Sequence, residues 1–593
     1  MVSVECGITS LPNEIAMKRT TELLHFVVLV FVLSGCEQPN QVDAASFPAD
    51  DVFLHGGIYT VYAEQPWAEA AAVRGDEIIY VGSNSGAEAL IGPDTQVHNL
   101  TGRMLLPGFH DSHVHLLSGG MLETGCKLTG LISLAEIRKR LIECRGRPGI
   151  GSVGWVTGGN WDRESFPGGV PDKELLDEIF PDRPAFLYSV DGHTAWVNSN
   201  ALKIAGIDRS TVDPTQGRIA RDPQSGELTG ILDEAAMDMV GDFVPELAEE
   251  ETEAALQAAI RLAHEYGITS IIEPGLDHDM MQPFVALSRA GDLKLRTIVS
   301  MSPISWTPGA FGPKVHEMIL DREQYRGPNL NPDSIKFYMD GVLETGTALL
   351  VDPYVNEDFD RSKPFYSQEL LNDYFTRIDR EGLQIHVHAI GDLATRMALD
   401  AFEAARAANG ETGNRHQIVH LQLIHADDIA RFGELNVGAT FQAIWAYPDF
   451  WIMELNLPEV GPERVQRMYP IASVKKAGGR IVGGSDWFVS SLNPLDAIET
   501  GVRRQQIGLE GGEILNADER VDLATMIAAY TINGAYIHDQ DDLVGSIKVG
   551  KKADLIVLDR NLFEVPTHQI NEAKVLMTLF DGEVVYQRSG DSH

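Results

Sequence analysis

Basic residues are scarce in this chain of 593 residues. There are 47 Lys and Arg against 86 Asp and Glu, which gives a formal net charge of −39. A protein that binds nucleic acid needs a basic face to displace counterions from the phosphates. The charge balance therefore argues against a nucleic-acid partner. It predicts a strongly hydrated surface suited to a salty or extracytoplasmic setting, with a specific cationic partner as the alternative, and it indicates little about the substrate.

Cysteine is also rare, with four in the whole chain. Cys6 and Cys36 lie in an N-terminal segment that we place outside the folded domain, so Cys126 and Cys144 remain. In an oxidising compartment a disulfide closing that short loop would contribute roughly 3 kcal/mol of stability. Two unpaired buried thiols fit the sequence equally well, and we expect neither cysteine to be catalytic.

The N-terminal apolar run, residues 23–33, is too short to span a bilayer. It follows a basic MKR segment at 17–19 and leads into LSGC at 33–36. This arrangement resembles a bacterial lipoprotein signal, in which Cys36 is lipidated and becomes the mature N-terminus, and Met17 is then a candidate for the true start. The alternative is a short buried helix. We expect residues 1–36 to be a signal peptide and 37–50 a linker, with the protein exported and held on the bacterial envelope, at the periplasmic side or the outer membrane, by its lipid anchor alone.

The chain has no low-complexity tract or obvious short repeat, and it is too long for one ordinary core. Short β segments with turns run from 51 to about 103 and return at 545–559 and 575–587. We expect the two ends, 51–106 and 541–593, to pair into a small β-sandwich. The catalytic domain would then lie between them, at 107–540.

Within 107–540, β-rich runs followed by amphipathic helical patterns recur. Together with an opening strand near 109 they number eight, which predicts a (β/α)8 barrel of the TIM type, with the further strands at 267–274, 295–302, 334–341, 383–392, 415–422, 437–444 and 478–487. Helices are expected at 252–267 and 367–382. The stretch at about 119–250 is too long for a βα loop, so we interpret it as a subdomain inserted over the C-terminal mouth of the barrel.

Candidate metal ligands collect at the C-terminal ends of these strands, where barrel enzymes place their active groups. In LLPGFHDSHVHL (105–116), His113 and His115 follow a Pro-Gly break two residues apart, so an extended backbone points both to one face. Alternation in 334–341 turns Lys336, Tyr338 and Asp340 inward. The other strand-end candidates are His388, His420, Gln442 and Asp486.

Each of these residues alone has an ordinary explanation. A strand histidine is most often a hydrogen-bonded core residue, which is how we interpret His386, His416 and His425, and an inward lysine is usually half of an ion pair. The combination of imidazoles, a lysine and an aspartate on five strands instead indicates a site for a divalent metal such as zinc.

The same motifs resemble the metal-dependent amidohydrolase superfamily, and within it the amidohydrolase 3 branch that includes N-substituted formamide deformylases. The resemblance extends over about 51–587 and rests on LPGFHDSHVH (106–115), SVDGHTAWVNSNAL (189–202), GITSIIEPG (267–275), IKFYMDG (335–341), HVHAIGD (386–392), VHLQLIHADDI (419–429), GGSDW (483–487) and the tail at 545–559. Two positions depart from the family pattern. Val419 replaces a usual Glu, and His110 replaces a usual apolar residue.

The resemblance implies a site with two Zn²⁺ ions. His113 and His115 would bind the more buried metal, His388 and His420 the second, and a carboxylated Lys336 would bridge the two. Asp486 would ligate the first metal and handle the proton of the shared water. The chemistry agrees, because a lysine ammonium has no lone pair and becomes a ligand only as a carbamate. Two cations about 3.5–4 Å apart lower the pKa of bound water from about 15.7 toward 7.

We therefore expect a hydrolase that cleaves a non-peptide C–N bond in a small acylated or formylated amine. Asp486 would pass a proton to the departing amine. We assign substrate contacts to His193 and Trp161 in the inserted segment, with packing in the subdomain core as the alternative. A lactonase or esterase on the same metals and a non-catalytic solute-binding lipoprotein remain as alternative functions, and the sequence leaves the oligomeric state open, a homo-oligomer included.

Overall fold

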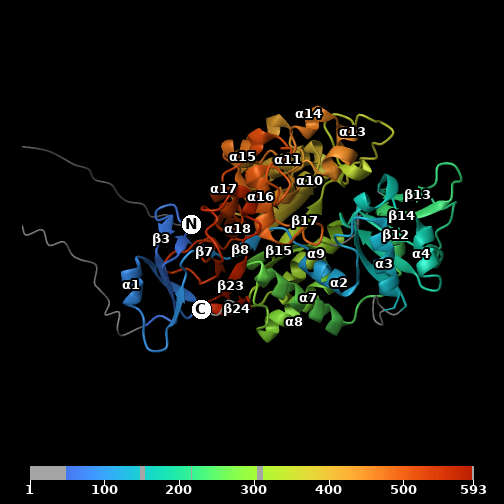
Figure 1. Cartoon of the computed structure of the whole chain (residues 1–593). Coiled ribbons are helices and arrows are strands. Elements are labelled where there is room, and N and C mark those ends of the chain that lie inside the picture. Colours follow the sequence, from blue (N-terminus) through green and yellow to red (C-terminus); the bar gives the residue numbers. More distant parts are fainter. Residues whose placement is uncertain (1–47, 147–153, 216, 303–310, 590–593) are drawn as a thin grey trace, which may run out of the picture.

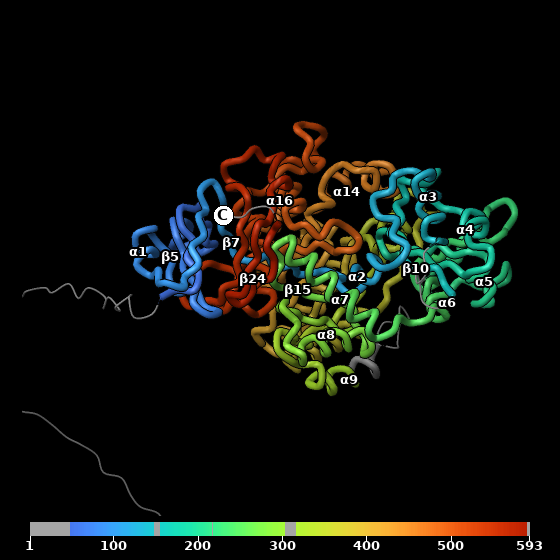
Figure 2. Tube along the Cα trace, turned by 60° about the horizontal axis from the view of Figure 1, so that its bottom comes forward, coloured from blue at the N-terminus to red at the C-terminus, as the bar shows by residue number. Residues whose placement is uncertain are grey.

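The computed structural model describes residues 48–146, 154–215, 217–302 and 311–589. The expected signal peptide, its Cys36 and most of the linker lie outside these ranges. Figures 1 and 2 show a central barrel with a β-rich body at one end and a subdomain at the other. A search of the described residues for a helix of sufficient length and apolarity to cross a membrane finds none.

Eight parallel strands form the central sheet, and this confirms the predicted barrel. In spatial order they are β8 (Phe109–Asp111), β15 (Ile268–Leu276), β16 (Arg296–Met301), β17 (Leu330–Tyr338), β18 (Gln384–Ala389), β19 (Gln417–His420), β20 (Gly438–Phe441) and β21 (Arg480–Gly483). Neighbouring strands pair parallel, with register shifts in the pairs β8-β15, β15-β16 and β16-β17. The Ser112 N–H donates to the Gly483 carbonyl at 3.0 Å. That hydrogen bond joins the first strand to the last.

The helices around the barrel begin and end where the sequence provides the signals. Helix α7 (Glu249–Glu265) opens with three glutamates, which suit the positive end of the helix dipole, and buries Leu256 and Ile260. Helix α10 (Gln368–Arg380) begins at Ser367, whose hydroxyl accepts from the Leu370 N–H at 3.3 Å. Its buried stripe packs on α11 (Asp392–Asn409) and on β18. The helices expected at 252–267 and 367–382 are both present.

Strands from the two ends of the chain share one sheet beside the barrel. In the order β24-β23-β22-β7-β2-β3, strand β22 (Leu555–Leu558) pairs antiparallel with β7 (Met104–Pro107), and β7 pairs parallel with β2 (Gly57–Tyr59). The remaining strands are β3 (Trp67–Ala68), β23 (Val575–Phe580) and β24 (Glu583–Gln587).

A second sheet, β5-β4-β1-β6, uses N-terminal strands alone: β1 (Asp51–Leu54), β4 (Ala70–Arg74), β5 (Glu77–Gly82) and β6 (Gln96–Asn99). The two sheets bury a common apolar core that includes Phe53, Leu105 and Leu579. The sandwich is tied to the barrel by Arg296 of β16, which donates to both oxygens of Asp554 at 2.8 and 3.0 Å.

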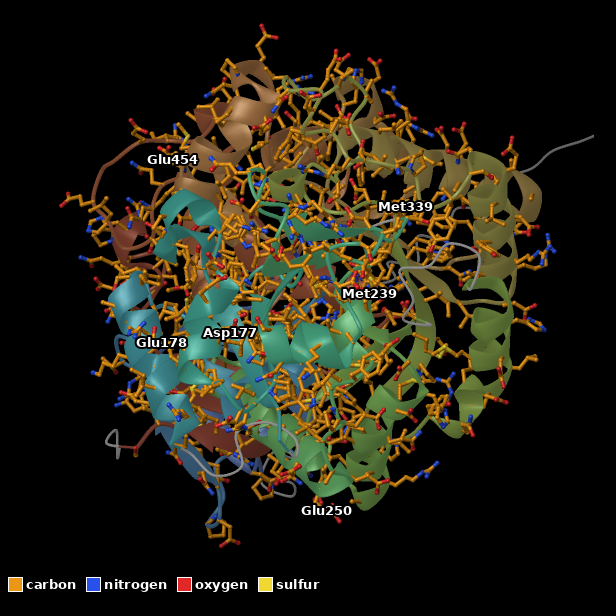
Figure 3. The ribbon with its side chains drawn as sticks, turned by 90° about the vertical axis from the view of Figure 1, so that its right-hand side faces the viewer. Asp177, Glu178, Met239, Glu250, Met339 and Glu454 are labelled. Carbon is orange, nitrogen blue, oxygen red and sulfur yellow. A yellow bond between two sulfur atoms is a disulfide. The ribbon has the colours of Figure 1, made fainter. Side chains whose placement is uncertain are left out.

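The inserted subdomain holds a six-stranded sheet in the order β13-β14-β12-β11-β10-β9. Its strands are β9 (Cys126–Lys127), β10 (Val156–Trp161), β11 (Ala185–Ser189), β12 (Thr194–Val197), β13 (Gly217–Arg221) and β14 (Leu228–Glu234). Figure 3 looks onto it from outside, where α4 (Lys173–Ile179) carries the exposed Glu178.

A disulfide joins Cys126 in β9 to Cys144 in α3 (Leu134–Arg145), which decides between the two alternatives left open by the sequence. Helix α2 (Leu116–Thr124), part of which the sequence assigned to the insertion, packs against α7 of the barrel.

Candidate metal centre

All six expected ligands line one cavity of about 1390 Å³ at the C-terminal ends of the barrel strands. His113 and His115 follow β8, and Asp486 follows β21. Lys336, His388 and His420 lie on β17, β18 and β19. The strand geometry thus brings together residues that are up to 373 positions apart in the sequence.

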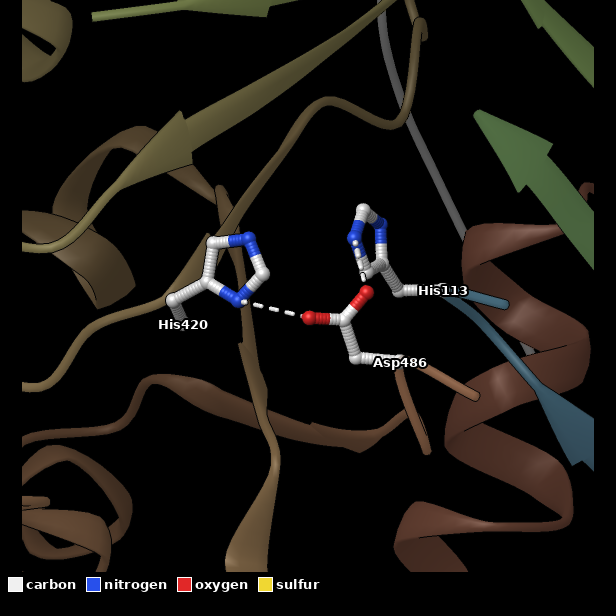
Figure 4. Close-up of side chains that lie close together, drawn as sticks. All are labelled: His113, His420 and Asp486. Atoms are coloured by element: carbon white, nitrogen blue, oxygen red, sulfur yellow. Dashed lines mark ion pairs between the residues drawn. The ribbon is translucent and has the colours of Figure 1, made fainter. Parts of the chain in front are cut away.

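The carboxylate of Asp486 lies between the imidazoles of strands one and six (Figure 4). Its Oδ1 is 3.2 Å from His113 Nε2 and 3.4 Å from His115 Nε2, and its Oδ2 is 3.8 Å from His420 Nδ1. Ligand atoms of His113, His420 and Asp486 all lie within 4.8 Å of one another. A single cation can therefore contact all three residues.

Backbone hydrogen bonds hold the segments that carry these ligands. The Asp486 N–H donates to the His113 carbonyl at 2.8 Å, and the His115 N–H donates to Trp487 at 2.7 Å. Buried Asp111 accepts from Ser485 N–H at 2.9 Å and from His113 N–H at 3.2 Å. His420 and Asp486 have positive φ angles of 79° and 54°, a strained conformation for residues other than glycine. The chain tolerates this strain where the ligands converge.

The imidazoles are neutral and therefore able to bind a cation. Burial, together with the charge of Lys336 and the neighbouring imidazoles, holds the pKa values of His113, His388 and His420 well below 6.5. The pKa of His115 falls to about 3 for the same reasons.

Neighbouring side chains leave one ring nitrogen of each key imidazole free for a metal. His113 Nδ1 lies 2.8 Å from His386 Nε2, and His420 Nδ1 lies 2.8 Å from the Gln442 side-chain oxygen. When each Nδ1 donates its proton there, each Nε2 keeps a lone pair. Both His113 Nε2 and Asp486 Oδ1 are buried without a hydrogen-bond partner among the described residues. Buried polar atoms of this kind fit a bound cation.

Lys336 is 1 % exposed and lies under the ring of Tyr338, with Nζ 4.9 Å from the ring centroid. The described residues offer it no carboxylate at ion-pair distance, so the ordinary explanation for an inward lysine does not apply. Burial lowers the pKa of its amine, while the negative charge of Asp486 acts in the opposite direction. Burial is the larger of the two effects, so this amine has a free lone pair more often than an exposed one.

His388 reaches the cavity with its ring centroid 4.5 Å from that of His420, but its Nε2 is 3.2 Å from the Gly341 carbonyl. Strand alternation predicted that Asp340 points inward, but the sequence assigned it no function. Its carboxylate accepts hydrogen bonds from the N–H groups of Leu349, Ile390 and Gly391 at 2.9 to 3.0 Å. It fixes the loops that follow strands four and five. His110 packs against His538, 5.0 Å between ring centroids, and does not line the cavity.

His193 extends from the inserted subdomain into the cavity, 5.7 Å from His388 between ring centroids. Its Nδ1 lies 2.9 Å from Oε2 of Glu234, a buried carboxylate that sequence reasoning missed. Burial opposes the charged imidazole, but Glu234 outweighs it and raises the pKa of His193 to about 9. The only signal for Glu234 in the sequence is that an acidic residue closes the apolar strand β14.

The prediction that Trp161 contacts substrate is wrong. Its side chain is fully buried in the subdomain core, donates from Nε1 to the Leu187 carbonyl at 3.0 Å and packs edge-on against Phe166. It does not line the cavity, whereas the next residue, Asp162, does. Successive residues of an extended strand point to opposite sides, which explains the difference.

Comparisons with known proteins agree with this geometry. The sequence profile described as the amidohydrolase family matches residues 96–586. Protein LONG AFTER FAR-RED 3 of Arabidopsis thaliana is 32 % identical over 91 % of this chain and 92 % of its own. N-substituted formamide deformylase of Arthrobacter pascens is 27 % identical over 91 % and 99 %. An uncharacterized metal-dependent hydrolase from Pyrococcus furiosus has a similar structure, with a TM-score of 0.66, 25 % identity and coverage of 86 % and 99 %.

Proposed function

Because this chain belongs to the amidohydrolase family, we propose that it is a metal-dependent hydrolase that cleaves a non-peptide C–N bond in a small acylated or formylated amine. The observation that carries this is the facing pair of buried, unpartnered ligand atoms, His113 Nε2 and Asp486 Oδ1, which lie 3.2 Å apart. The N-substituted formamide deformylase of A. pascens, matched along nearly its whole length, supports the choice of bond.

The residues that would hold two Zn²⁺ ions are His113, His115, Lys336, His388, His420 and Asp486. When bound, such cations polarise a substrate carbonyl and supply a water that deprotonates near neutral pH. The mixed nitrogen and oxygen donor set suits zinc.

Lys336 contributes as a carbamate. Its neutral amine attacks the carbon of CO₂, an N–C bond forms as one C–O π bond opens, and one N–H proton passes to water, so the neutral side chain becomes an anion with two oxygen donors. Burial without an ion-pair partner favours the neutral amine that this reaction needs.

Asp486 moves the proton. Its buried carboxylate accepts a proton from the attacking water and delivers it to the nitrogen of the departing amine. Burial raises the pKa of this carboxyl, with Lys336 opposing, so the group can carry a proton between the two steps. His193, which lies beside His388 and is held by Glu234, orients the acyl part of the substrate.

The chemistry of the disulfide also bears on localisation. A bridge between Cys126 and Cys144 is typical of proteins that fold in an oxidising compartment. It supports the proposal that the protein is exported, and we propose in addition that Cys36 of the LSGC segment carries the lipid anchor. Radiolabelled palmitate incorporated into the wild type but not into a Cys36→Ala variant would support the anchor, and equal labelling would contradict it.

The test of the catalytic proposal is Asp486→Asn, which keeps the shape of the side chain but removes its base. We expect kcat on N-formyl and N-acyl amines to fall by roughly 10²- to 10⁴-fold while elemental analysis still finds bound metal. The exposed Asp358→Asn is the control and keeps wild-type kcat. Full activity in Asp486→Asn would refute the proton-transfer role. Parallel assays on cyclic imides, lactones and esters test whether the enzyme cleaves a bond to nitrogen or a bond to oxygen.

A further inference from the structure

One wall of the cavity is aromatic and continuous with the metal centre. It is formed by the segment that follows β20, which contributes Trp445, Tyr447, Phe450 and Trp451 to the lining. The ring of Trp445 stacks on the imidazole of His420, 5.8 Å between centroids and inclined by 12°. A substrate held at the ligands therefore has an aromatic surface directly beside it.

Four carboxylates line the same part of the cavity: Asp162, Asp191, Glu344 and Asp449. The negative charges of these carboxylates raise one another's pKa values. Burial, then Glu344 and Asp162, raises the pKa of Asp449 to about 7, and Asp191 adds to the raised pKa values of Asp162 and Glu344. We call these four carboxylates and the four aromatic side chains the acidic aromatic wall.

Positive charge near this wall is small. Arg163 Nε lies 3.6 Å from Asp191 Oδ2 behind the cavity surface. Among the described lining residues the cationic side chains are Lys336 and His193, which lie at the metal centre, and Arg289, whose guanidinium donates to the Gln324 carbonyl. The charge of His193 is paired with Glu234. Arg504 lies behind Tyr469, with its guanidinium carbon 6.0 Å from the ring centroid. The four partly buried carboxylates outnumber these two arginines, and a cation in the cavity would favour the ionised form of each carboxylate.

Tyr469 adds an unpaired hydroxyl to the same part of the cavity. It is 2 % exposed, yet it lines the cavity, and its hydroxyl makes no hydrogen bond to any described residue. Asp449 and Glu344 act on this hydroxyl electrostatically, which places it beside the acidic aromatic wall. The hydroxyl is absent from the buried polar atoms that lack a partner, so it is open to the cavity, where a bound group can form a hydrogen bond with it.

The wall carboxylates do not form a compact group of metal-ligating side chains. In the described ranges, the group of His, Cys, Asp and Glu side chains close enough to share a metal is His113, His420 and Asp486, and none of the four wall carboxylates belongs to it. Carboxylates spread among aromatic rings instead suit an organic ammonium, which is larger and interacts favourably with ring faces.

We propose that the acidic aromatic wall binds an ammonium group of the substrate, so that the amide cleaved at the metal centre is one that carries a second, cationic nitrogen. This inference rests on the proposed function, which assigns the amide of the substrate to the metal centre. It adds that the part of the substrate farther from the metals carries an ammonium group.

Binding is tested with choline and its neutral isostere 3,3-dimethylbutan-1-ol, titrated by calorimetry into the metal-loaded full chain. A desolvated cation–π contact with added carboxylates predicts that choline binds at least about 10-fold more tightly. Equal affinity for the two probes overturns the proposal without need of any variant.

Substitutions in the acidic aromatic wall test whether choline binds there. Glu344→Gln and Asp449→Asn each remove a charge but keep the acceptor that Asn456 Nδ2 and the Ile452 N–H use, at 2.8 Å in both cases. Each is expected to weaken choline binding by roughly 10-fold, and Tyr469→Phe by less. Glu454→Gln is the matched control, because Glu454 lies on the same segment but is exposed and outside the lining (Figure 3). Wild-type choline affinity in both charge variants overturns the site.

A hydrolysis assay with two matched substrates distinguishes a failure of the ammonium site from a failure of the proposed function. The substrates are the N-formyl derivatives of 3-(trimethylammonio)propylamine and of 4,4-dimethylpentylamine, which differ in one charge. We expect kcat/KM to favour the cation by at least about 10-fold in the wild type and in Glu454→Gln, and the preference to disappear in Asp449→Asn. Equal hydrolysis of both formamides refutes the ammonium site and keeps the hydrolase. Choline binding without hydrolysis of either formamide keeps the ammonium site and counts against the proposed reaction.

Discussion

The link between His193 and Glu234 gives a prediction whose size follows from the structure. Glu234 is buried at the end of β14 and accepts at both oxygens, Oε2 from His193 Nδ1 at 2.9 Å and Oε1 from Thr347 Oγ1 at 2.9 Å. Thr347 belongs to the loop after β17, so this carboxylate connects the subdomain to the barrel. Glu234→Gln keeps the acceptor for Thr347 and removes the charge that faces His193.

The expected loss of stability depends on pH in a defined direction. The folded-state pKa of His193 is raised from 6.5 to about 9, so the folded protein binds this proton more tightly than the unfolded chain does. The stabilisation is complete below pH 6.5 and disappears as the pH rises through 9. At 1.36 kcal/mol per pKa unit it amounts to about 3 kcal/mol. Little of this is lost to solvent screening, because the two side chains are only 12 % and 2 % exposed.

The assay is urea unfolding of wild type and Glu234→Gln at pH 6 and pH 10, with the same metal content. Tryptophan fluorescence and circular dichroism must give coincident transitions before a free energy is taken. We expect the variant to be less stable by about 3 kcal/mol at pH 6 and by under about 1 kcal/mol at pH 10. Glu227→Gln, which breaks an exposed ion pair with Arg209, should change stability by under about 1 kcal/mol. A deficit that is equal at both pH values, or larger at pH 10, refutes the reasoning.

Three further predictions concern the scaffold. Replacing Cys126 and Cys144 by Ser should lower the free energy of unfolding by roughly 3 kcal/mol, measured against the wild type with and without reductant. Asp554→Ala leaves Asp581 as the remaining carboxylate partner of the buried Arg296 guanidinium and should cost about 3 kcal/mol in the same assay. A cost under about 1 kcal/mol would mean that Asp581 and water compensate for the lost carboxylate. Trp161→Phe should destabilise the subdomain but leave KM unchanged, and a raised KM would return Trp161 to the substrate site.

The barrel could be predicted because its signals are local. Each strand is a short apolar run that ends at a polar residue, and parallel strands bring those ends to one rim. His113, His115, Lys336, His388, His420 and Asp486 could therefore be placed at one cavity before any coordinates. What the pattern did not reveal is that His388 Nε2 faces the Gly341 carbonyl, or that Asp340 holds the neighbouring loops.

The inserted subdomain was harder to interpret because its contacts with the barrel are not periodic. Glu234 is 41 residues from His193, and nothing in the local sequence pairs them. Trp161 and Asp162 are adjacent, yet one lies in a core and the other lines the cavity, and choosing between them needs the direction of β10. The acidic aromatic wall combines residues from the subdomain, the loop after β17 and the segment after β20, so no single stretch of sequence contains it.

The metal content of the purified protein tests the central claim most directly. Elemental analysis after purification without chelators should find about two divalent ions per wild-type chain. It should find fewer in Lys336→Ala, which lacks the proposed bridging ligand. Fewer than one bound divalent ion per wild-type chain, with hydrolysis not restored by added zinc, would contradict the account and favour a protein that binds a solute without reacting with it.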